Sequence, residues 1–175
     1  LHRSWEQKYI DFAWNGTSFV VTNDGSALDV PPIRESTGHP VVLAFGTFRA
    51  GSNFDSTDTG KKEAKYTAGR NGIGAKGCGA FGTMEVVVSN FLDKRTVTVK
   101  WAKNMASVDV GKPTAYKNKT NRTSVSWTPD YERLNTSPAN MNLITSWLAH
   151  NAALCAPAKL RITYNGTAIK TRSPK

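Results

Sequence analysis

Residues 66–82 read YTAGRNGIGAKGCGAFG, and this glycine-rich stretch decides which fold the sequence predicts. It holds six of the chain's 14 glycines, all within residues 69–82. Glycine adopts positive φ without penalty and lets a ligand approach the backbone closely. Free backbone N–H groups in such a loop can surround phosphate oxygens, and Lys76 can place a positive charge beside them. From glycine content alone, a phosphate-binding loop and a flexible hinge both remain open.

The stretch does not match the two commonest nucleotide-binding motifs. A P-loop needs Gly-Lys-Ser or Gly-Lys-Thr at a fixed spacing, and this sequence lacks it. The G-x-G-x-x-G motif of a Rossmann site is a poor match in its strand context. If the stretch binds phosphate, it therefore belongs to a different nucleotide-binding fold.

The sequence on both sides of the stretch predicts strands. Alternating or β-branched runs lie at residues 9–13, 18–21, 84–90, 96–102, 123–127 and 159–164. Asn15-Gly16 fits a hairpin turn between the first two runs, and residues 91–95 fit a turn between the third and fourth.

Two segments predict helices. Residues 41–48 are apolar and could form a strand or a helix, of which we prefer the helix. Residues 138–153 have helical spacing, and the apolar face predicted for them comprises Met141, Leu143, Ile144, Trp147, Leu148 and Ala152. The order of these elements predicts an α+β fold, a two-layer sandwich in which a mixed, mostly antiparallel sheet carries helices on one face.

Composition and charge limit the classes of protein that fit. The chain is 39% hydrophobic and 10% aromatic, which is too rich for a disordered protein. It contains no apolar run near the roughly 20 residues that cross a bilayer. Cys78 and Cys155 fit neither a disulfide framework nor a paired metal site, which favours a reducing, intracellular compartment.

The net charge is +10, from 23 basic and 13 acidic residues. A field of that sign attracts polyphosphates and nucleic acid, although a solvated basic surface is the alternative. The histidines His2, His39 and His150 lack the spacing of metal ligands, so we expect them at the surface or in the core.

Residues 68–76, AGRNGIGAK, closely resemble the GGRNGYGAK loop of eukaryotic and T-even phage type II DNA topoisomerases, which are GHKL (Bergerat-fold) ATPases. Further similarities follow in the family's order. VVTNDG at 20–25 resembles the strand and turn that present the adenine-recognising side chain, and RAGSNF at 49–54 resembles the SSNY segment at the ribose and phosphates. TSVSWTPD at 123–130 is similar to GTKVTFKPD, and LRITYNG at 160–166 is similar to VKVFLNGK.

The resemblance implies an ATP site. It places Asn23 at the adenine, with Thr123 as support, and Ser52 and Asn53 at the ribose and phosphates. A one-residue shift would bring Asp24 to the adenine instead. Each of these residue types is also common in plain turns or strands. The implied phosphate loop comprises Gly69, Arg70, Asn71, Gly72, Ile73, Gly74, Ala75 and Lys76.

The sequence also departs from the family's pattern. SALD at 26–29 replaces the usual R-G-I-P, and Arg122 replaces the glycine before Thr123. Glu6 and Asn15 are misplaced for the family's catalytic glutamate and Mg²⁺-binding asparagine, which we therefore expect upstream of Leu1. We expect no catalytic or metal-binding residue here, and interpret residues 1–175 as a segment of a GHKL ATPase domain that we expect to be incomplete at its N-terminus.

The function implied by the resemblance is ATP binding with Mg²⁺ in a type II DNA topoisomerase, where ATP-driven closure of a gate between two ATPase domains serves DNA strand passage. The implied partners are DNA, a second copy of the chain and the cleavage core of the same enzyme. Residues 40–54 look most like the T-even phage version. The alternative is a divergent, non-hydrolysing nucleotide- or DNA-binding module with the same fold. The loop form at residues 70–72 argues against other GHKL ATPases.

Overall fold

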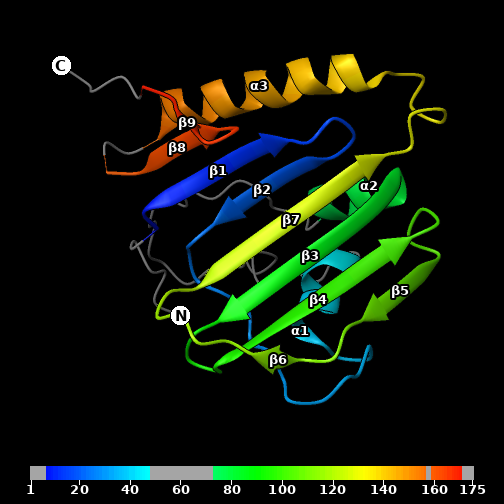
Figure 1. The fold of residues 1–175 in the computed structure, drawn as a ribbon. Coiled ribbons are helices and arrows are strands. Elements are labelled where there is room, and N and C mark those ends of the chain that lie inside the picture. The colour runs from blue at the N-terminus through cyan, green and yellow to red at the C-terminus, as the bar shows by residue number, and fades with distance from the viewer. Residues whose placement is uncertain (1–6, 48–72, 157–158, 171–175) are drawn as a thin grey trace, which may run out of the picture.

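The computed structural model describes residues 7–47, 73–156 and 159–170, which form two layers (Figure 1). One layer is a nine-stranded sheet, and the other contains the helices. The strands of the described part are β1 (Tyr9–Trp14), β2 (Phe19–Asn23), β3 (Gly82–Asn90), β4 (Arg95–Ala102), β5 (Ser107–Val110), β6 (Thr114–Ala115), β7 (Arg122–Pro129), β8 (Arg161–Tyr164) and β9 (Thr167–Ala168). Its helices are α1 (Pro40–Gly46), α2 (Gly74–Ala80) and α3 (Pro138–Cys155).

The sheet is mixed and mostly antiparallel, as the sequence predicts. Its strand order is β5-β4-β3-β7-β2-β1-β8-β9, and β6 pairs with β4. Only the β1–β8 pair is parallel among the described strands. Strand β7 lies between the two predicted hairpins, β1–β2 and β3–β4, and joins them into one sheet.

One face of the sheet forms the core. The register aligns Val99, Val86, Val125, Val21 and Phe12 in one row across five strands. Directly paired residues share a face of the sheet, so this row points to one side. The buried cluster on that side contains Val30, Val41, Met84, Val86, Val88, Val97, Val99, Trp101 and Val110.

All three described helices cover this same face. Val41 of α1 belongs to the core cluster, and α2 contacts β3 and β7. Helix α3 contacts β8, β1 and β2, and Tyr164, which pairs with Phe12 of the core row, donates a hydrogen bond to Asn142 of α3. Figure 1 shows α3 along the β8 side and α1 and α2 behind β3 and β4. The predicted two-layer α+β sandwich is confirmed.

The opposite face of the sheet carries polar side chains, and no described helix covers it. Thr22 and Ser124 join β2 and β7 through their hydroxyls at 2.9 Å. Lys100 of β4 forms an ion pair with Glu85 of β3 at 2.7 Å. A sheet with one packed and one polar face is the usual antiparallel solution, because its strands alternate apolar and polar residues. We call this side the open face.

The glycine-rich stretch differs from its prediction. Residues Gly74–Ala80 form the helix α2 instead of continuing the predicted loop. Alanine and lysine favour helix, and Gly79 lets α2 approach Met84 and Met105, since a Cβ there would lie 2.9 Å from Met105 Cγ. The short strands β5, β6 and β9 were not predicted either, because they depend on pairing with distant strands.

The predicted apolar face of α3 is partly wrong. Its buried residues are Met141, Thr145, Ala149 and Ala153, whereas Ile144 and Leu148 are 44% and 39% exposed. Small side chains at 149 and 153 let the helix lie close to the sheet, so the helix turns this side inward. The predicted helix over residues 41–48 is confirmed for residues 41–46 as α1, which Pro40 begins and which the His39 side chain caps. Thr47 lies beyond the end of α1, and residue 48 lies outside the described residues.

We expect Gly82→Ala to destabilise the protein by at least about 2 kcal/mol, because an added side chain would overpack a rigid site. A Cβ at Gly82 would lie 2.1 Å from the Thr128 carbonyl oxygen of the neighbouring strand. Gly77→Ala is the matched control, since its Cβ would meet no atom within 4 Å inside α2. We expect Gly77→Ala to stabilise by about 0.5–1 kcal/mol. Urea unfolding measures both changes, and equal effects of the two variants would contradict the prediction.

We expect His39 to make the stability depend on pH. His39 is 3% exposed, its Nδ1 accepts a hydrogen bond from Val41 N at 3.3 Å, and burial lowers its pKa. The unfolded chain therefore takes up the proton first as pH falls below about 6.5. The free energy of unfolding falls progressively from that pH down to the lowered pKa of the folded state.

His39→Asn keeps a capping acceptor and should remove this loss of stability between about pH 7 and about pH 5.5. The matched control is His150→Asn, because His150 is exposed. Unfolding curves at several pH values measure the effect. An unchanged pH dependence in His39→Asn would exclude His39 as its source.

Candidate functional site

The two residues predicted to recognise adenine are neighbours in the structure. Asn23 ends β2 and pairs directly with Thr123 of β7, although 100 positions separate them in the sequence. Thr123 pairs in turn with Val88, which belongs to the buried core. Because paired residues share a face, Asn23 and Thr123 lie on the helix-covered side. The tertiary structure thus brings this part of the predicted site together.

The Asn23 side chain also shapes the turn that follows β2. Its Oδ1 accepts a hydrogen bond from Gly25 N at 3.1 Å, which forms an Asx turn. The Nδ2 group of the same amide makes no hydrogen bond with the described residues. One side of the amide therefore holds the backbone, and the other remains available as a donor.

Asp24, the alternative adenine residue, has a structural role. Its Oδ1 accepts hydrogen bonds from Lys8 N at 2.9 Å and Tyr9 N at 3.0 Å. These bonds hold the first residues of β1 against the end of β2. The geometry therefore favours Asn23 over Asp24 at the adenine position.

Lys76 is the most unusual charged residue of the described part. It lies in α2 and is only 3% exposed. No described residue forms a hydrogen bond or an ion pair with its amine. Burial lowers the pKa of Lys76, because the charged form loses its hydration. A buried amine without an anion is unfavourable unless a ligand supplies one.

The remaining residues of the predicted phosphate loop divide into two groups. Ile73 and Gly74 are exposed at the start of α2, and Ala75 is half-buried in its first turn. The other predicted residues lie outside the described part of the chain, so their placement stays a prediction: Ser52, Asn53, Gly69, Arg70, Asn71 and Gly72.

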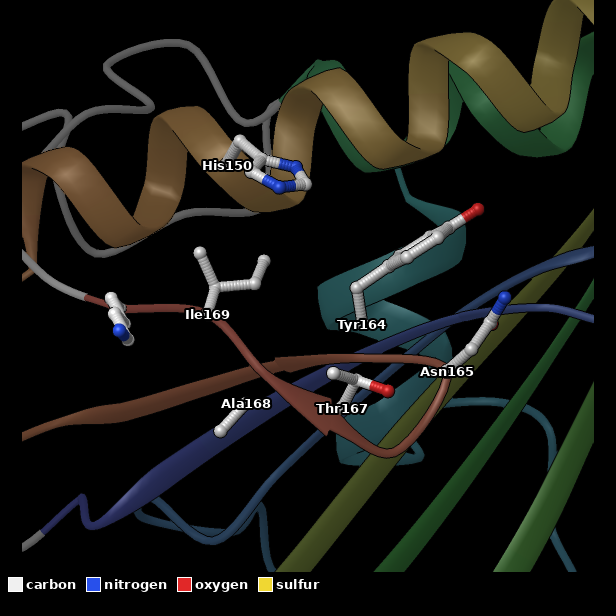
Figure 2. Close-up of a pocket in the computed structure, with 7 residues that line it drawn as sticks. His150, Tyr164, Asn165, Thr167, Ala168 and Ile169 are labelled. Atoms are coloured by element: carbon white, nitrogen blue, oxygen red, sulfur yellow. The ribbon is translucent and has the colours of Figure 1, made fainter.

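Three cavities whose linings lie among the described residues contain no residue predicted to bind ATP. The largest, about 600 Å³, lies between the C-terminal half of α3 and the turn that joins β8 to β9 (Figure 2). Figure 2 shows His150 of α3 above Ile169 and Tyr164. The Tyr164 hydroxyl and the Nδ1 atom of His150 already bond to α3. The two smaller cavities, of about 370 and 270 Å³, lie on the open face.

The described residues contain no group of three or more His, Cys, Asp or Glu side chains that could hold a metal ion. Both cysteines are free, and burial raises the pKa of the Cys78 thiol. No described helix is long and apolar enough to span a membrane.

Comparison with known sequences finds similarity to DNA topoisomerase 2, while no protein-family model matches. Probable DNA topoisomerase 2 of Dictyostelium discoideum is 30% identical over 159 residues, which are 87% of this chain and 10% of that protein. DNA topoisomerase 2 of Saccharomyces cerevisiae is 32% identical over 114 residues, 65% of this chain and 8% of that protein. DNA topoisomerase 2 of Invertebrate iridescent virus 6 is 32% identical over 131 residues, 69% and 11% of the two chains. The chain thus spans about a tenth of the relatives that it matches.

Solved structures show the same fold. The ATPase region of Saccharomyces cerevisiae topoisomerase II superposes with a TM-score of 0.81 at 23% identity, covering 95% of this chain and 44% of that one. The ATPase and transducer domains of DNA topoisomerase II from Balamuthia mandrillaris give a TM-score of 0.77 at 22% identity, covering 95% and 43%.

We expect Lys76→Met to raise the free energy of unfolding of the nucleotide-free chain by about 1 kcal/mol, because it keeps the side-chain length and removes a charge from a side chain that is 3% exposed and has no ion-pair partner among the described residues. Lys112→Met is the matched control, since Lys112 is exposed. Urea unfolding without nucleotide measures both variants. A loss of stability in Lys76→Met would show that the amine stabilises the fold.

Proposed function

We propose, from the premise that this chain is a homologue of DNA topoisomerase 2 with the fold of its ATPase region, that it binds ATP on the helix-covered side of the sheet. Residues 1–175 would form a segment of the ATPase domain of such an enzyme. The proposal takes the identity of the nucleotide from the homologues and the position of the site from the described residues.

The nearly buried side chain of Lys76 carries the proposal. It is 3% exposed and has no partner among the described residues, and an anionic ligand would compensate its charge. The outer phosphates of ATP would accept its hydrogen bonds, and their charge would raise the lowered pKa of Lys76 again. Lys76 is the last residue of the GRNGIGAK sequence at 69–76, which resembles the family's phosphate-binding loop.

The pair Asn23 and Thr123 would recognise the base. The free Nδ2 group of Asn23 can donate to a ring nitrogen of adenine, and the Thr123 hydroxyl lies beside it in the register. The residues from Gly69 to Gly72, together with Ser52 and Asn53, complete the proposed site around the ribose and phosphates. Arg70 adds a second cation to that set.

Hydrolysis would follow attack of water on the γ-phosphate. Mg²⁺ would supply charge neutralisation in the family's reaction, but the described residues offer no metal-ligand cluster for it. We therefore assign neither the general base nor the metal ligands to a described residue. ATP-driven closure of a gate between two copies, capture of DNA and attachment to a cleavage core belong to the same proposal, as does an intracellular location.

The second candidate is a nucleotide-binding module that does not hydrolyse ATP. The departure from R-G-I-P at residues 26–29 favours it, since a glycine that lets the backbone bend beneath the nucleotide is absent there. An assay of phosphate release separates the two candidates. Binding without turnover would support the second.

Calorimetric titration with a non-hydrolysable ATP analogue, with and without Mg²⁺, tests the proposed site. We expect Lys76→Met to weaken binding at least about tenfold, because hydrogen bonds to charged groups contribute about 1.5–3 kcal/mol. Lys112→Met should bind like the wild type. Since Lys76→Met should also be the more stable protein, weaker binding cannot be attributed to unfolding. Equal affinities of wild type and Lys76→Met would remove Lys76 from the phosphate site.

Asn23→Ala tests the base. We expect it to weaken binding of the ATP analogue about five- to twentyfold, and to leave the affinity for tripolyphosphate unchanged, because the proposed site places Asn23 at the adenine and not at the phosphates. Thr22→Val is a suitable control for the neighbouring position, since Thr22 points to the open face and bonds Ser124. Equal losses of affinity for the ATP analogue and for tripolyphosphate would contradict an adenine contact by Asn23.

A further inference from the structure

The open face of the sheet holds a cavity that the proposed nucleotide site does not use. Its volume is about 370 Å³, and it lies where β1, β7 and β8 begin. The strands β1, β2, β7 and β8 all contribute to it. The lining side chains that matter here are Tyr9, Asp11, Thr22, Arg122, Arg161 and Thr163.

The register explains why residues so far apart in the sequence meet there. Tyr9 pairs with Arg161, and Asp11 pairs with both Thr22 and Thr163. These positions alternate with the core residues of the same strands, so they point away from the helices. Arg122 precedes Thr123 of the helix-covered side and therefore also belongs to the open face.

The two arginines stand on either side of the cavity. Their strands, β7 and β8, are separated by β2 and β1, so their backbones lie about 14 Å apart at the usual strand spacing of about 4.8 Å. Both arginines are exposed, and neither forms an ion pair with a described residue. A guanidinium group presents a planar fork of donors that matches phosphate oxygens.

The floor of the cavity is polar and ordered. Thr22 and Thr163 are 6% and 8% exposed, and their hydroxyls bond to Ser124 and to the Asp11 carboxylate. The Asp24 carboxylate at the same end of the sheet accepts from two backbone N–H groups. The negative charges of Asp11 and Asp24 repel an anion, so a single small phosphate would gain little binding energy in this cavity. A polyanion that contacts both arginines at once, attracted by a net charge of +10, fits better.

Arg122 is also one of the places where the chain departs from its resemblance to the topoisomerases, which have glycine before the threonine of this strand. The departure adds a positive charge to the open face and leaves the helix-covered side unchanged. Arg122 is therefore a feature of this chain and not of the shared ATP site.

We propose that Arg122 and Arg161 bind the phosphodiester backbone of a nucleic acid on the open face of the sheet, on the side away from the ATP site. The choice of nucleic acid over another polyphosphate rests on the proposed function, whereas the position rests on the cavity and its two unpaired arginines.

Fluorescence anisotropy with a short labelled DNA duplex tests the site over a range of salt concentrations. Arg122→Gln and Arg161→Gln each lower the affinity about three- to tenfold at low salt and reduce the salt slope by about one. Lys112→Gln removes the same charge from the connection between β5 and β6 and changes the affinity much less. Asp11→Asn keeps an acceptor for Thr163 and raises the affinity, which a purely structural role of the cavity would not do.

Titration with tripolyphosphate distinguishes the sources of phosphate. If Arg122→Gln weakens tripolyphosphate binding and leaves the DNA affinity unchanged, the cavity is a polyphosphate site and the proposal fails. The proposal would also be overturned if Arg122→Gln and Arg161→Gln bound DNA with the same affinity as Lys112→Gln. Titration with the ATP analogue tests the proposed function separately, because we expect binding of the analogue to depend on Lys76 and not on Arg122. Unchanged unfolding midpoints of the variants show that the fold is intact.

Discussion

The pairing of β7 with β2 and β3 is the constraint on which the rest of the structure depends. Strand β7 joins two hairpins that each form locally, and its register aligns Val21, Val125 and Val86 on the core side. The same register places Thr123 beside Asn23. A slip of one residue would turn every side chain of β7 to the other face, so the apolar row would be lost together with the Asn23–Thr123 pair. Core and site are thus fixed by one set of hydrogen bonds.

Some polar groups inside the protein have no hydrogen-bond or ion-pair partner among the described residues. Among the described residues, the Nε2 atom of His39 and the Nε1 atom of Trp127 are buried without a hydrogen bond, and the Lys76 side chain, which is 3% exposed, has no anionic partner. His39 caps α1, and Lys76 lies in α2, which contacts α1. Such local conflicts with stability are typical of functional sites, where a ligand completes the interactions. The helix layer near α2 is therefore where we place the proposed phosphate contact.

The sheet separates two chemical environments. Its helix-covered side combines an apolar core with the side chains of Asn23 and Thr123 at the strand ends, where the proposed nucleotide would lie. Its open face carries hydroxyls, the Glu85–Lys100 ion pair and the two arginines at the beginning of β7 and β8. Alternation along each strand produces this separation, since neighbouring residues such as Arg122 and Thr123 point to opposite sides. The two proposed ligands, the nucleotide and the nucleic acid, would therefore bind to opposite faces of one sheet.

Local sequence patterns were sufficient to predict the hairpins, the helix that begins at Pro138, the α+β class and the resemblance that names the candidate residues. These features depend on turn chemistry and periodicity within short segments, where Asn15-Gly16 or a β-branched run acts on its immediate neighbours. Only the tertiary structure decided that α2 begins at Gly74, that Thr145 and Ala149 face inward on α3, that Asp24 holds β1, and that Arg161 lies across the sheet from Arg122. Each of these outcomes depends on packing or pairing between segments distant in the sequence, and no local pattern encodes which distant segment will be the partner.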